Sequence, residues 1–379
     1  RRLKCGVIAQ MWDIGNPRKG EYRFVEDIFT RGIVLEQHKE PALSRDLQEF
    51  TSPGPSALME REPAADPDAL TAEEIITIAK EAGIIDESDG MPLWEKLRQG
   101  RSQGISVLAV DAIDDEPYIS SQLCPAIQLG DQMAGGARLA QKALGAQESF
   151  VAIYKHLMDV ETKIPQEIAG LPVHRITGGY PAEYRANRQL QDKNTLLLGA
   201  CAMIHLWRAV YQNRKQDTCF VTVAGNCIAN PMNLEVTIGM TAMQLLERCG
   251  LAQNPTRIVA GGSMMGYGVL DPEKTLVGPT TRGLIAFREY SKHVGYTCIG
   301  CGRCTKVCPQ GLSPYYLYQF ITRKKMKYID RFDLERCIGC GTCSYVCPAK
   351  LDLSTIIFTG KVERLAKAGK EVTYETDAQ

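Results

Sequence analysis

The sequence predicts an α/β fold that is followed by a smaller β-rich module and ends in a helical, cysteine-rich domain. The apolar run Ile105–Val110 and the segment Phe150–Tyr154 have the character of buried strands, and Gln132–Leu144 between them has helical spacing. A strand, a helix and a second strand in this order predict a parallel sheet covered by helices. Eight of the 14 cysteines lie between Cys298 and Cys347, which sets the C-terminal region apart from the rest of the chain.

Local signals mark the start of the α/β domain. Residues 51–71 are rich in Pro, Ala, Ser and acidic side chains, which is typical of a linker. Thr71 with Glu74 forms a capping-box pattern, and the apolar positions that follow predict a helix of about a dozen residues. Asn194–Val210, which is rich in Leu and Ala, is expected to form another helix of this domain.

The region after residue 218 changes to shorter elements. Phe220–Val223 and Leu234–Thr237 have strand character, Thr241–Cys249 has helical character, and a flexible loop is expected at Gly261–Gly266. These elements predict a separate α+β module. The expected division is an N-terminal segment and linker (1–70), an α/β domain (71–212), the small module (213–288) and the cysteine-rich domain with its tail (289–379).

Charge and hydropathy exclude several classes of protein. The 44 basic and 44 acidic side chains balance, so the whole chain has no field that would attract nucleic acid or a membrane surface. The apolar run from Leu196 to Trp207 is interrupted by His205 and is shorter than the roughly 20 residues of a membrane-spanning helix. No secretory leader is visible, so a reducing cytoplasm is expected. Six scattered cysteines are interpreted as small buried hydrophobes, namely Cys5, Cys124, Cys201, Cys219, Cys227 and Cys249.

The strongest motif is a duplicated run of cysteines. Cys298-x2-Cys301-x2-Cys304-x3-Cys308-Pro309 is followed by Cys337-x2-Cys340-x2-Cys343-x3-Cys347-Pro348. Such runs bind 4Fe–4S clusters, and the fourth cysteine of each run ligates the cluster of the other run. The predicted ligands are therefore Cys298, Cys301, Cys304 and Cys347 for the first cluster, and Cys337, Cys340, Cys343 and Cys308 for the second.

The alternative for this motif is a pair of zinc sites. Structural zinc usually takes cysteines as two separated pairs, which fits two complete runs poorly. The 28 residues between the runs, 309–336, predict two helices, as in helical dicluster ferredoxin domains. Arg323, Lys324, Lys325 and Lys327, here called the basic patch, either attract an acidic electron carrier or form an ordinary solvated helix end.

With these motifs in place, residues 71–365 resemble the C subunit of the Rnf ferredoxin:NAD oxidoreductase and its soluble relatives, which include electron-transfer proteins linked to proline reductase. Residues 218–288 resemble the SLBB β-grasp module of that family, with Gly261–Gly266 in the expected position. Ile113–Ile119 resembles the acidic segment that borders flavin and nicotinamide there, so the resemblance assigns Glu116 to the cofactor side. The resemblance implies a Rossmann-like domain for residues 71–212.

One departure from the family concerns the flavin. The family holds FMN over a GGAGFP loop, whereas this chain has the acidic sequence Asp86-Glu87-Ser88-Asp89-Gly90-Met91-Pro92. Carboxylates repel a phosphate that glycine amides would bind, so FMN is not expected at this position. Upstream, no convincing equivalent of the family's N-terminal lipoyl-like segment is found.

The expected function is single-electron transfer through two 4Fe–4S clusters, between a redox partner such as an acidic ferredoxin or flavoprotein and a terminal reductase. Peripheral association with a membrane complex is compatible with this function, and no residue is proposed as catalytic. Two alternatives stay open. The chain could be an NADH-oxidising flavoenzyme that uses Glu116 and an altered FMN site, or a structural subunit whose clusters only hold an interface together. The electron donor, the acceptor and the oligomeric state do not follow from the sequence.

Overall fold

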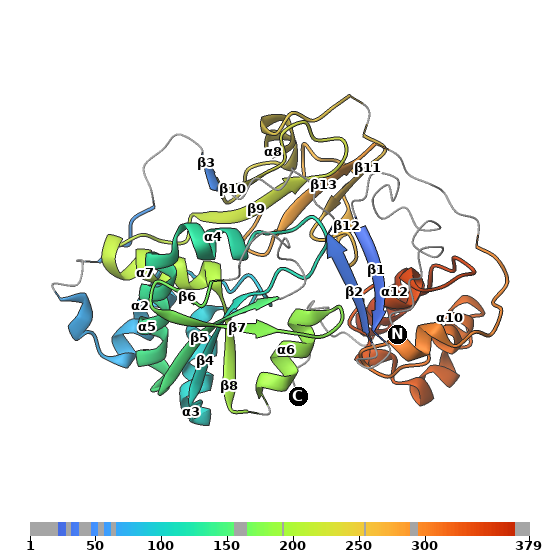
Figure 1. Cartoon of the computed structure of the whole chain (residues 1–379), viewed down its shortest axis with the longest axis horizontal. Helices are drawn as coiled ribbons and strands as arrows, with labels where there is room; N and C mark the ends of the chain where they lie inside the picture. Colours follow the sequence, from blue (N-terminus) through green and yellow to red (C-terminus); the bar gives the residue numbers. More distant parts are fainter. Residues whose placement is uncertain are drawn as a thin grey trace.

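The computed structural model describes residues 22–27, 32–37, 47–51, 57–61, 66–154, 165–191, 193–253, 255–288 and 295–367. Figure 1 shows the α/β domain, a second sheet above it and a helical C-terminal region beside both. Near the N-terminus, β1 (Tyr22–Asp27) and β2 (Gly32–Gln37) pair as an antiparallel hairpin. Cys5, which was interpreted as a buried hydrophobe, lies outside the described residues.

The α/β domain contains a five-stranded sheet in the order β6-β7-β5-β4-β8. Its strands are β4 (Val107–Ala112), β5 (Glu148–Tyr154), β6 (Glu167–Ile168), β7 (Leu171–Ile176) and β8 (Thr195–Gly199). Strands β7, β5, β4 and β8 are parallel, and β6 is an antiparallel edge. The predicted parallel sheet is confirmed.

Helices cover both faces of this sheet (Figure 1). The larger core packs one face against α2 (Ala72–Glu81), α3 (Leu93–Gln103), α5 (Gly130–Leu144) and α7 (Ala200–Gln212), with the short α4 (Leu123–Gln128) at its edge. The other face packs against α6 (Ala182–Gln191). The capping box at Thr71 is present, and it follows the short 3-10 turn η2 (Pro67–Ala69).

One expectation for this domain is wrong. The segment Asn194–Val210 is not a single helix, because its first part forms strand β8 beside β4 and the helix α7 begins at Ala200. A short apolar run that is buried on both faces has the same composition in a parallel strand as in a core helix, so periodicity does not distinguish the two. The correction places a helix N-terminus directly at the end of a central strand.

The second sheet has the order β12-β11-β13-β9-β10-β3 and carries the module predicted at residues 213–288. Its strands are β3 (Leu47–Phe50), β9 (Thr218–Ala224), β10 (Met232–Thr237), β11 (Arg257–Ala260), β12 (Tyr267–Gly268) and β13 (Gly283–Phe287). Helix α8 (Ala242–Arg248), with a capping box at Thr241, packs into its core. Strand β3 comes from the N-terminal segment and pairs in parallel with β10.

The C-terminal region is helical. It contains α9 (Arg303–Val307), α10 (Pro314–Thr322), the 3-10 turns η3 (Met326–Phe332) and η4 (Leu334–Arg336), α11 (Thr342–Tyr345) and α12 (Leu353–Lys367). Only one of the two helices expected between the cysteine runs is an α-helix. Lys324 follows α10 with a positive φ of 53°, a conformation that ends helices, and 3-10 turns take the place of the second helix.

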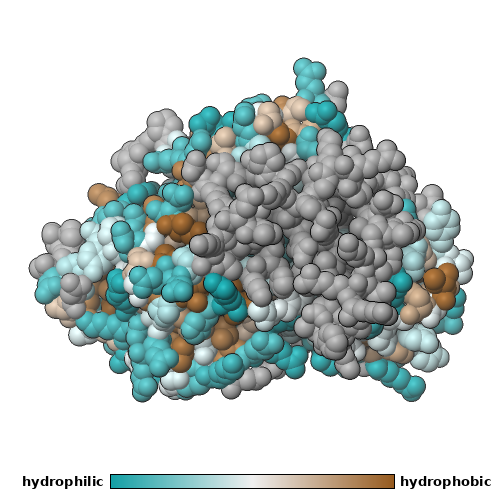
Figure 2. Space-filling view, in the orientation of Figure 1, coloured by the Kyte–Doolittle hydropathy of each residue, from teal (hydrophilic) through white to brown (hydrophobic). Residues whose placement is uncertain are grey.

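No helix in the described part of the chain is long and apolar enough to cross a membrane. In the space-filling view, hydrophilic and hydrophobic side chains are mixed over the α/β domain (Figure 2).

Candidate cluster sites and the crevice of the α/β domain

The first cysteine run lies at the surface. Cys301 is exposed, Cys298 and Cys304 are partly buried, and Ile299 between them is 70% exposed. Gly300 and Gly302 adopt positive φ values of 71° and 69°, and the Gly300 N–H donates to Cys298 Sγ over 3.4 Å. Glycine is the residue that adopts this conformation without strain, so the loop turns its amides toward the sulfur atoms. This loop is accessible to another protein.

The second cysteine run has the same local geometry, with Cys340 buried and Cys337 and Cys343 partly buried. Gly339 and Gly341 adopt positive φ values of 69° and 74°. Cys340 is buried, and its Sγ lies 3.0 Å from the Thr342 hydroxyl. Burial raises the pKa of the Cys340 thiol to about 12 and also raises that of Cys343. Bound iron is therefore what would hold these sulfurs as thiolates at neutral pH.

The fourth cysteine of each run lies with the first three of the other run. Cys308 shares a cavity with Cys337, Cys340 and Cys343. Burial is the main cause of the raised pKa of these three thiols, and the charge of Cys308 adds to it. Cys347, in turn, contributes to the raised pKa of Cys304. Among the described residues, no three Cys, His, Asp or Glu side chains converge on a single metal ion. A cubane does not need such convergence, because its cysteines bind different irons. The residues present thus fit two 4Fe–4S clusters.

The second run is packed against the other two domains. Tyr180 from the α/β domain and Met264 from the small module form one apolar cluster with Val307, Cys340 and Tyr345. A side chain on Gly341 would approach the Met264 carbonyl oxygen to 2.7 Å, so only glycine fits this contact. Burial lowers the pKa of the Arg185 guanidinium, and the nearby Cys340 and Cys308 oppose this shift.

Glu116, which the resemblance assigned to the cofactor side, connects two domains. Its Oε1 accepts hydrogen bonds from the Tyr180 hydroxyl at 2.6 Å and the Met265 N–H at 2.9 Å, and its Oε2 accepts from the Met264 N–H at 2.9 Å. Burial raises the pKa of this carboxyl group, and these hydrogen bonds oppose the shift. The carboxylate is thus occupied by the loop Gly261–Gly266, whose Gly262 leaves the space that it fills.

The carboxylates of the acidic segment at residues 86–89 all have partners within the chain. Lys96 Nζ lies 2.8 Å from Asp86 Oδ2 and 2.7 Å from Asp89 Oδ2. Glu87 Oε1 accepts from the Cys201 N–H at 2.8 Å, and Oε2 accepts from the Ala202 N–H at 3.0 Å. The sequence indicated three carboxylates facing a phosphate, but the structure pairs two with a lysine and places the third at the start of α7.

Arg282 brings a cation from the small module to the same edge of the sheet. Its guanidinium pairs with Glu183 at 2.5 Å and with Asp114 at 3.4 Å. Asp115, the residue after Asp114, accepts hydrogen bonds from the N–H groups of Ala182 and Glu183. Burial, together with the charge of Glu183, raises the pKa of Asp115 to about 7. The sequence did not predict a role for Arg282 or Lys96, because no local sequence pattern indicates which carboxylates they pair with.

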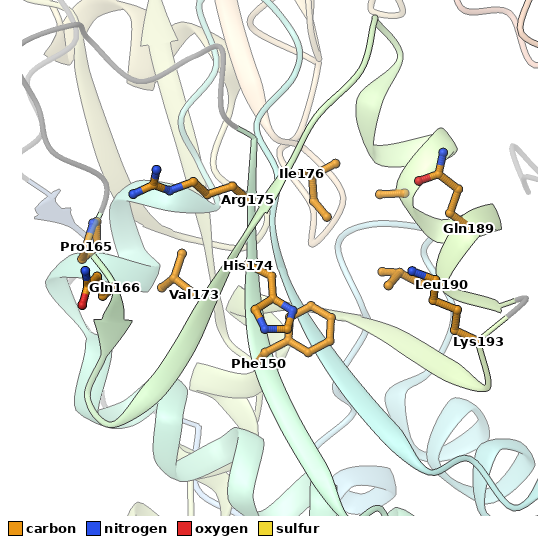
Figure 3. Close-up of a pocket in the computed structure, with 11 residues that line it drawn as sticks. Phe150, Pro165, Gln166, Val173, His174, Arg175, Ile176, Gln189, Leu190 and Lys193 are labelled. Carbon is orange, nitrogen blue, oxygen red and sulfur yellow. The ribbon is translucent and has the colours of Figure 1, made fainter. Parts of the chain in front are cut away.

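A pocket of about 610 Å³ lies apart from all these groups, between β7, β5 and α6. Figure 3 shows the His174 ring stacked over Phe150, with Leu190 and Lys193 of the opposite wall facing it and Arg175 directed away. His174 and Lys193 are exposed, and among the described residues that line the pocket there is no cluster cysteine and no acidic side chain. It offers no convergent set of catalytic groups.

Comparison with known families supports the C-terminal and small-module assignments. Residues 297–351 match the 4Fe-4S dicluster domain family, and residues 220–268 match the SLBB domain family. The predicted cofactor content of two 4Fe–4S clusters is thereby confirmed.

Relatives with curated names are C subunits of ion-translocating complexes. The chain is 26% identical over 276 residues to the C subunit of the proton-translocating ferredoxin:NAD(+) oxidoreductase complex of Clostridium ljungdahlii, covering 65% of this chain and 58% of that protein. It is 28% identical over 285 residues to the C subunit of the ion-translocating oxidoreductase complex of Rhodobacter capsulatus, with coverage of 67% and 53%. The chain thus spans little more than half the length of these relatives.

A solved structure has the same fold at low identity. The NAD+-reducing NiFe-hydrogenase in its H2-reduced state aligns with a TM-score of 0.53 and 13% identity, over 86% of this chain and 68% of that chain. The resemblance to the C subunits and the combination of α/β, SLBB and dicluster domains are therefore confirmed.

Proposed function

We propose that this RnfC-like chain relays single electrons between protein redox partners through its two 4Fe–4S clusters. The carrying observation is that both cysteine sets are complete and that the first contains an exposed cysteine, Cys301, whereas the cysteines of the second are buried or partly buried. Each cluster, when bound, accepts and releases one electron at a time. The chain's own residues place the first site where a partner can reach it and enclose the second between three domains.

The first site is also where an acidic partner would be attracted. Tyr315, at the start of α10, hydrogen-bonds to Cys298 through its hydroxyl and to Cys304 through its backbone N–H. The basic patch follows the end of the same helix. All four cations of the patch are exposed. Such a surface speeds the encounter with an acidic ferredoxin or flavoprotein, while apolar contacts at Ile299 would complete the interface.

The relatives are named as subunits of ion-translocating complexes, which supports assembly with further redox subunits. We infer that the chain delivers electrons to, or takes them from, a larger oxidoreductase with which it associates peripherally. A purely structural role for the clusters is disfavoured, because the first loop is exposed to solvent rather than buried in an interface within the described chain.

The test is anaerobic stopped-flow reduction of the chain by an excess of reduced plant-type ferredoxin, an acidic one-electron donor. Reversing the charge of the four cations of the basic patch should slow reduction about tenfold or more at low salt and have little effect at high salt. Iron content should stay unchanged.

The matched control reverses four exposed cations elsewhere, which gives the same change in net charge. Suitable positions are Lys80, Lys193, Arg248 and Lys274. This control should retain most of the parent's rate. If the two variants are slowed equally, net charge rather than the patch governs docking, and if ferredoxin does not reduce the parent at a useful rate, the structural role takes the place of the relay.

A further inference from the structure

The α/β domain has a crevice at the position where this class of sheet binds its ligands. From β4 the chain continues through α5 to β5 on one side, whereas β8 lies on the other side of β4. Ligands of open parallel sheets bind outside the carboxyl ends of the strands at such a change of direction. In this chain, that place is bounded by Asp111 at the end of β4 and by Gly199, where β8 leads into α7.

A carboxyl group already occupies the anion-binding end of α7. The N-terminus of a helix offers free N–H groups and a favourable dipole, which is how many folds bind a ligand phosphate. Both oxygens of Glu87 accept these N–H groups, from Cys201 at 2.8 Å and Ala202 at 3.0 Å. A Cβ on Gly199 would lie 2.3 Å from the Glu87 carboxyl carbon, so the backbone is shaped to admit this side chain.

The groups around Glu87 are neutralised by partners within the chain. Asp86 accepts from the Gly199 N–H at 3.1 Å and pairs with Lys96, which is itself buried. Arg282 reaches across from the small module and pairs with Asp114 and Glu183. No cation at this edge is left for a ligand phosphate within the described residues, because Lys96 and Arg282 each carry two carboxylate partners.

The cavity beside Glu87 is too small for a nucleotide. A cavity of about 10 Å³ adjoins Glu87 and is lined by Ser121, His205 and Arg282. Within the described structure, Ser121 Oγ and His205 Nε2 are buried there without hydrogen-bond partners. Such a volume holds about one water molecule, which would satisfy both groups, whereas cofactor sites enclose hundreds of cubic ångströms.

We propose that Glu87 is a built-in substitute for a ligand phosphate, and that it closes the crevice of the α/β domain so that neither flavin nor nicotinamide binds there. The domain then serves as a scaffold that holds the second cysteine run through Tyr180, together with Met264 of the small module. This inference is independent of the proposed relay, because a chain with FMN at α7 could still pass electrons through its clusters.

The first test uses the parent protein. Chain produced with excess FMN and riboflavin available should contain no stoichiometric flavin after desalting, and equilibrium dialysis against FMN should give no saturable binding in the micromolar range. NADH should not bleach the clusters without an added flavoprotein. Stoichiometric FMN in the parent would overturn the proposal, whatever the variants do.

The second test is a chemical rescue. Glu87→Ala removes a fragment of the size of acetate, so the variant should lose about 5 °C or more of melting temperature, and millimolar acetate should restore much of it. Acetamide, which has the same shape but carries an N–H donor in place of one acceptor oxygen, should not. The matched control is Glu74→Ala, which removes a carboxylate that accepts the Thr71 N–H at the exposed start of α2 and should not be rescued.

Rescue of the two variants to the same extent, or rescue by acetamide as effective as rescue by acetate, would refute the role of Glu87 as the carboxyl group that occupies the start of α7. If Glu87→Ala does not fold, the milder Glu87→Gln replaces it. Its amide group must direct an N–H at a backbone N–H of α7, so it should also melt below the parent. An unchanged melting temperature for Glu87→Gln at pH 5 would contradict the proposal.

Discussion

The cysteine-rich domain keeps the residues that bind its clusters, whereas the α/β domain fills the crevice where a ligand would bind with its own side chains. In the cysteine-rich domain, the glycine loops are retained, and Cys308 and Cys347 are placed beside the cysteines of the opposite run. At the crevice of the α/β domain, Glu87, Asp86 and Arg282 fill the edge of the sheet and their charges are satisfied within the chain. The fold is shared with the solved hydrogenase structure, but a fold alone does not carry a site.

The two regions differ in whether their buried groups need a ligand to become stable. Buried thiols whose pKa is raised, such as Cys340, are poor thiolates until a metal binds, so the structure there is incomplete without its cofactor. Buried carboxylates with lysine or arginine partners are already neutralised, and inserting a phosphate would separate those pairs. Charge satisfaction therefore distinguishes the cluster sites, which need a cofactor, from the crevice, which on our proposal does not.

The largest expected effect tests the pairing of the two cysteine runs. The parent should contain about eight irons in two clusters, and Cys308→Ser should lose the cluster of the second run, because Cys308 lies with Cys337, Cys340 and Cys343. Iron analysis and electron paramagnetic resonance of the dithionite-reduced protein measure this loss.

Two reference variants identify which cluster disappears. Cys340→Ser removes a ligand of the second run, and Cys301→Ser removes one of the first. The spectrum of Cys308→Ser should match that of Cys340→Ser. If it matches Cys301→Ser instead, each run holds its own fourth ligand and the assignment is wrong.

The sequence was sufficient to predict features that depend on a short local pattern. The capping box at Thr71 and the duplicated cysteine runs are short patterns whose chemistry depends on fixed spacing, and each was predicted from that spacing. The prediction of a single helix at Asn194–Val210 was wrong, because a buried parallel strand and a buried helix have the same composition.

Long-range pairing accounts for what could not be predicted. Glu87 meets the start of α7 more than 100 residues away, and Arg282 meets Glu183 and Asp114 from another module. The sequence indicated that the acidic segment would repel phosphate, but only the fold shows that Glu87 accepts the amides at the start of α7. Tyr180 and Arg185 likewise reach the second run through tertiary packing alone.

A smaller effect concerns the pH dependence of stability. Burial, then the charge of Asp86, raises the pKa of Glu87 to about 7 from its ordinary value of 4.5. The folded state therefore holds a proton that the unfolded state releases first, so the contribution of Glu87 is fully present below pH 4.5 and is lost as the pH rises through 7. The shift corresponds to a free-energy change on the order of 3 kcal/mol.

Melting temperatures of the parent and of Glu87→Gln between pH 5 and 7.5 measure this contribution. The parent should lose stability relative to the variant across that range, while Asp115 titrates equally in both proteins and cancels. Glu74→Gln is the control, since hydrogen bonds from Thr71 lower the pKa of Glu74 and its contribution stays constant above 4.5. Parallel curves for the parent and Glu87→Gln would show that the carboxyl group of Glu87 titrates as it does in water.

The smallest expected effect sharpens the contrast between an exposed and an enclosed cluster site. Arg185 on α6 lies within electrostatic reach of Cys340 and Cys308. A nearby cation stabilises the more negative reduced state, so Arg185→Leu should lower the potential of the second cluster by roughly 50 mV, or about 1 kcal/mol for one electron. The first cluster, near the exposed loop, should keep its potential because water screens it.

Redox titration followed by electron paramagnetic resonance resolves the two clusters, with the cysteine variants providing the assignment. Arg188→Leu is the matched control, because Arg188 is exposed on the same helix, three positions after Arg185. It removes the same charge from the domain but should leave both potentials within a few millivolts of the parent. Equal shifts for the two arginine variants, or a shift confined to the first cluster, would mean that the α/β domain encloses the second site without tuning it.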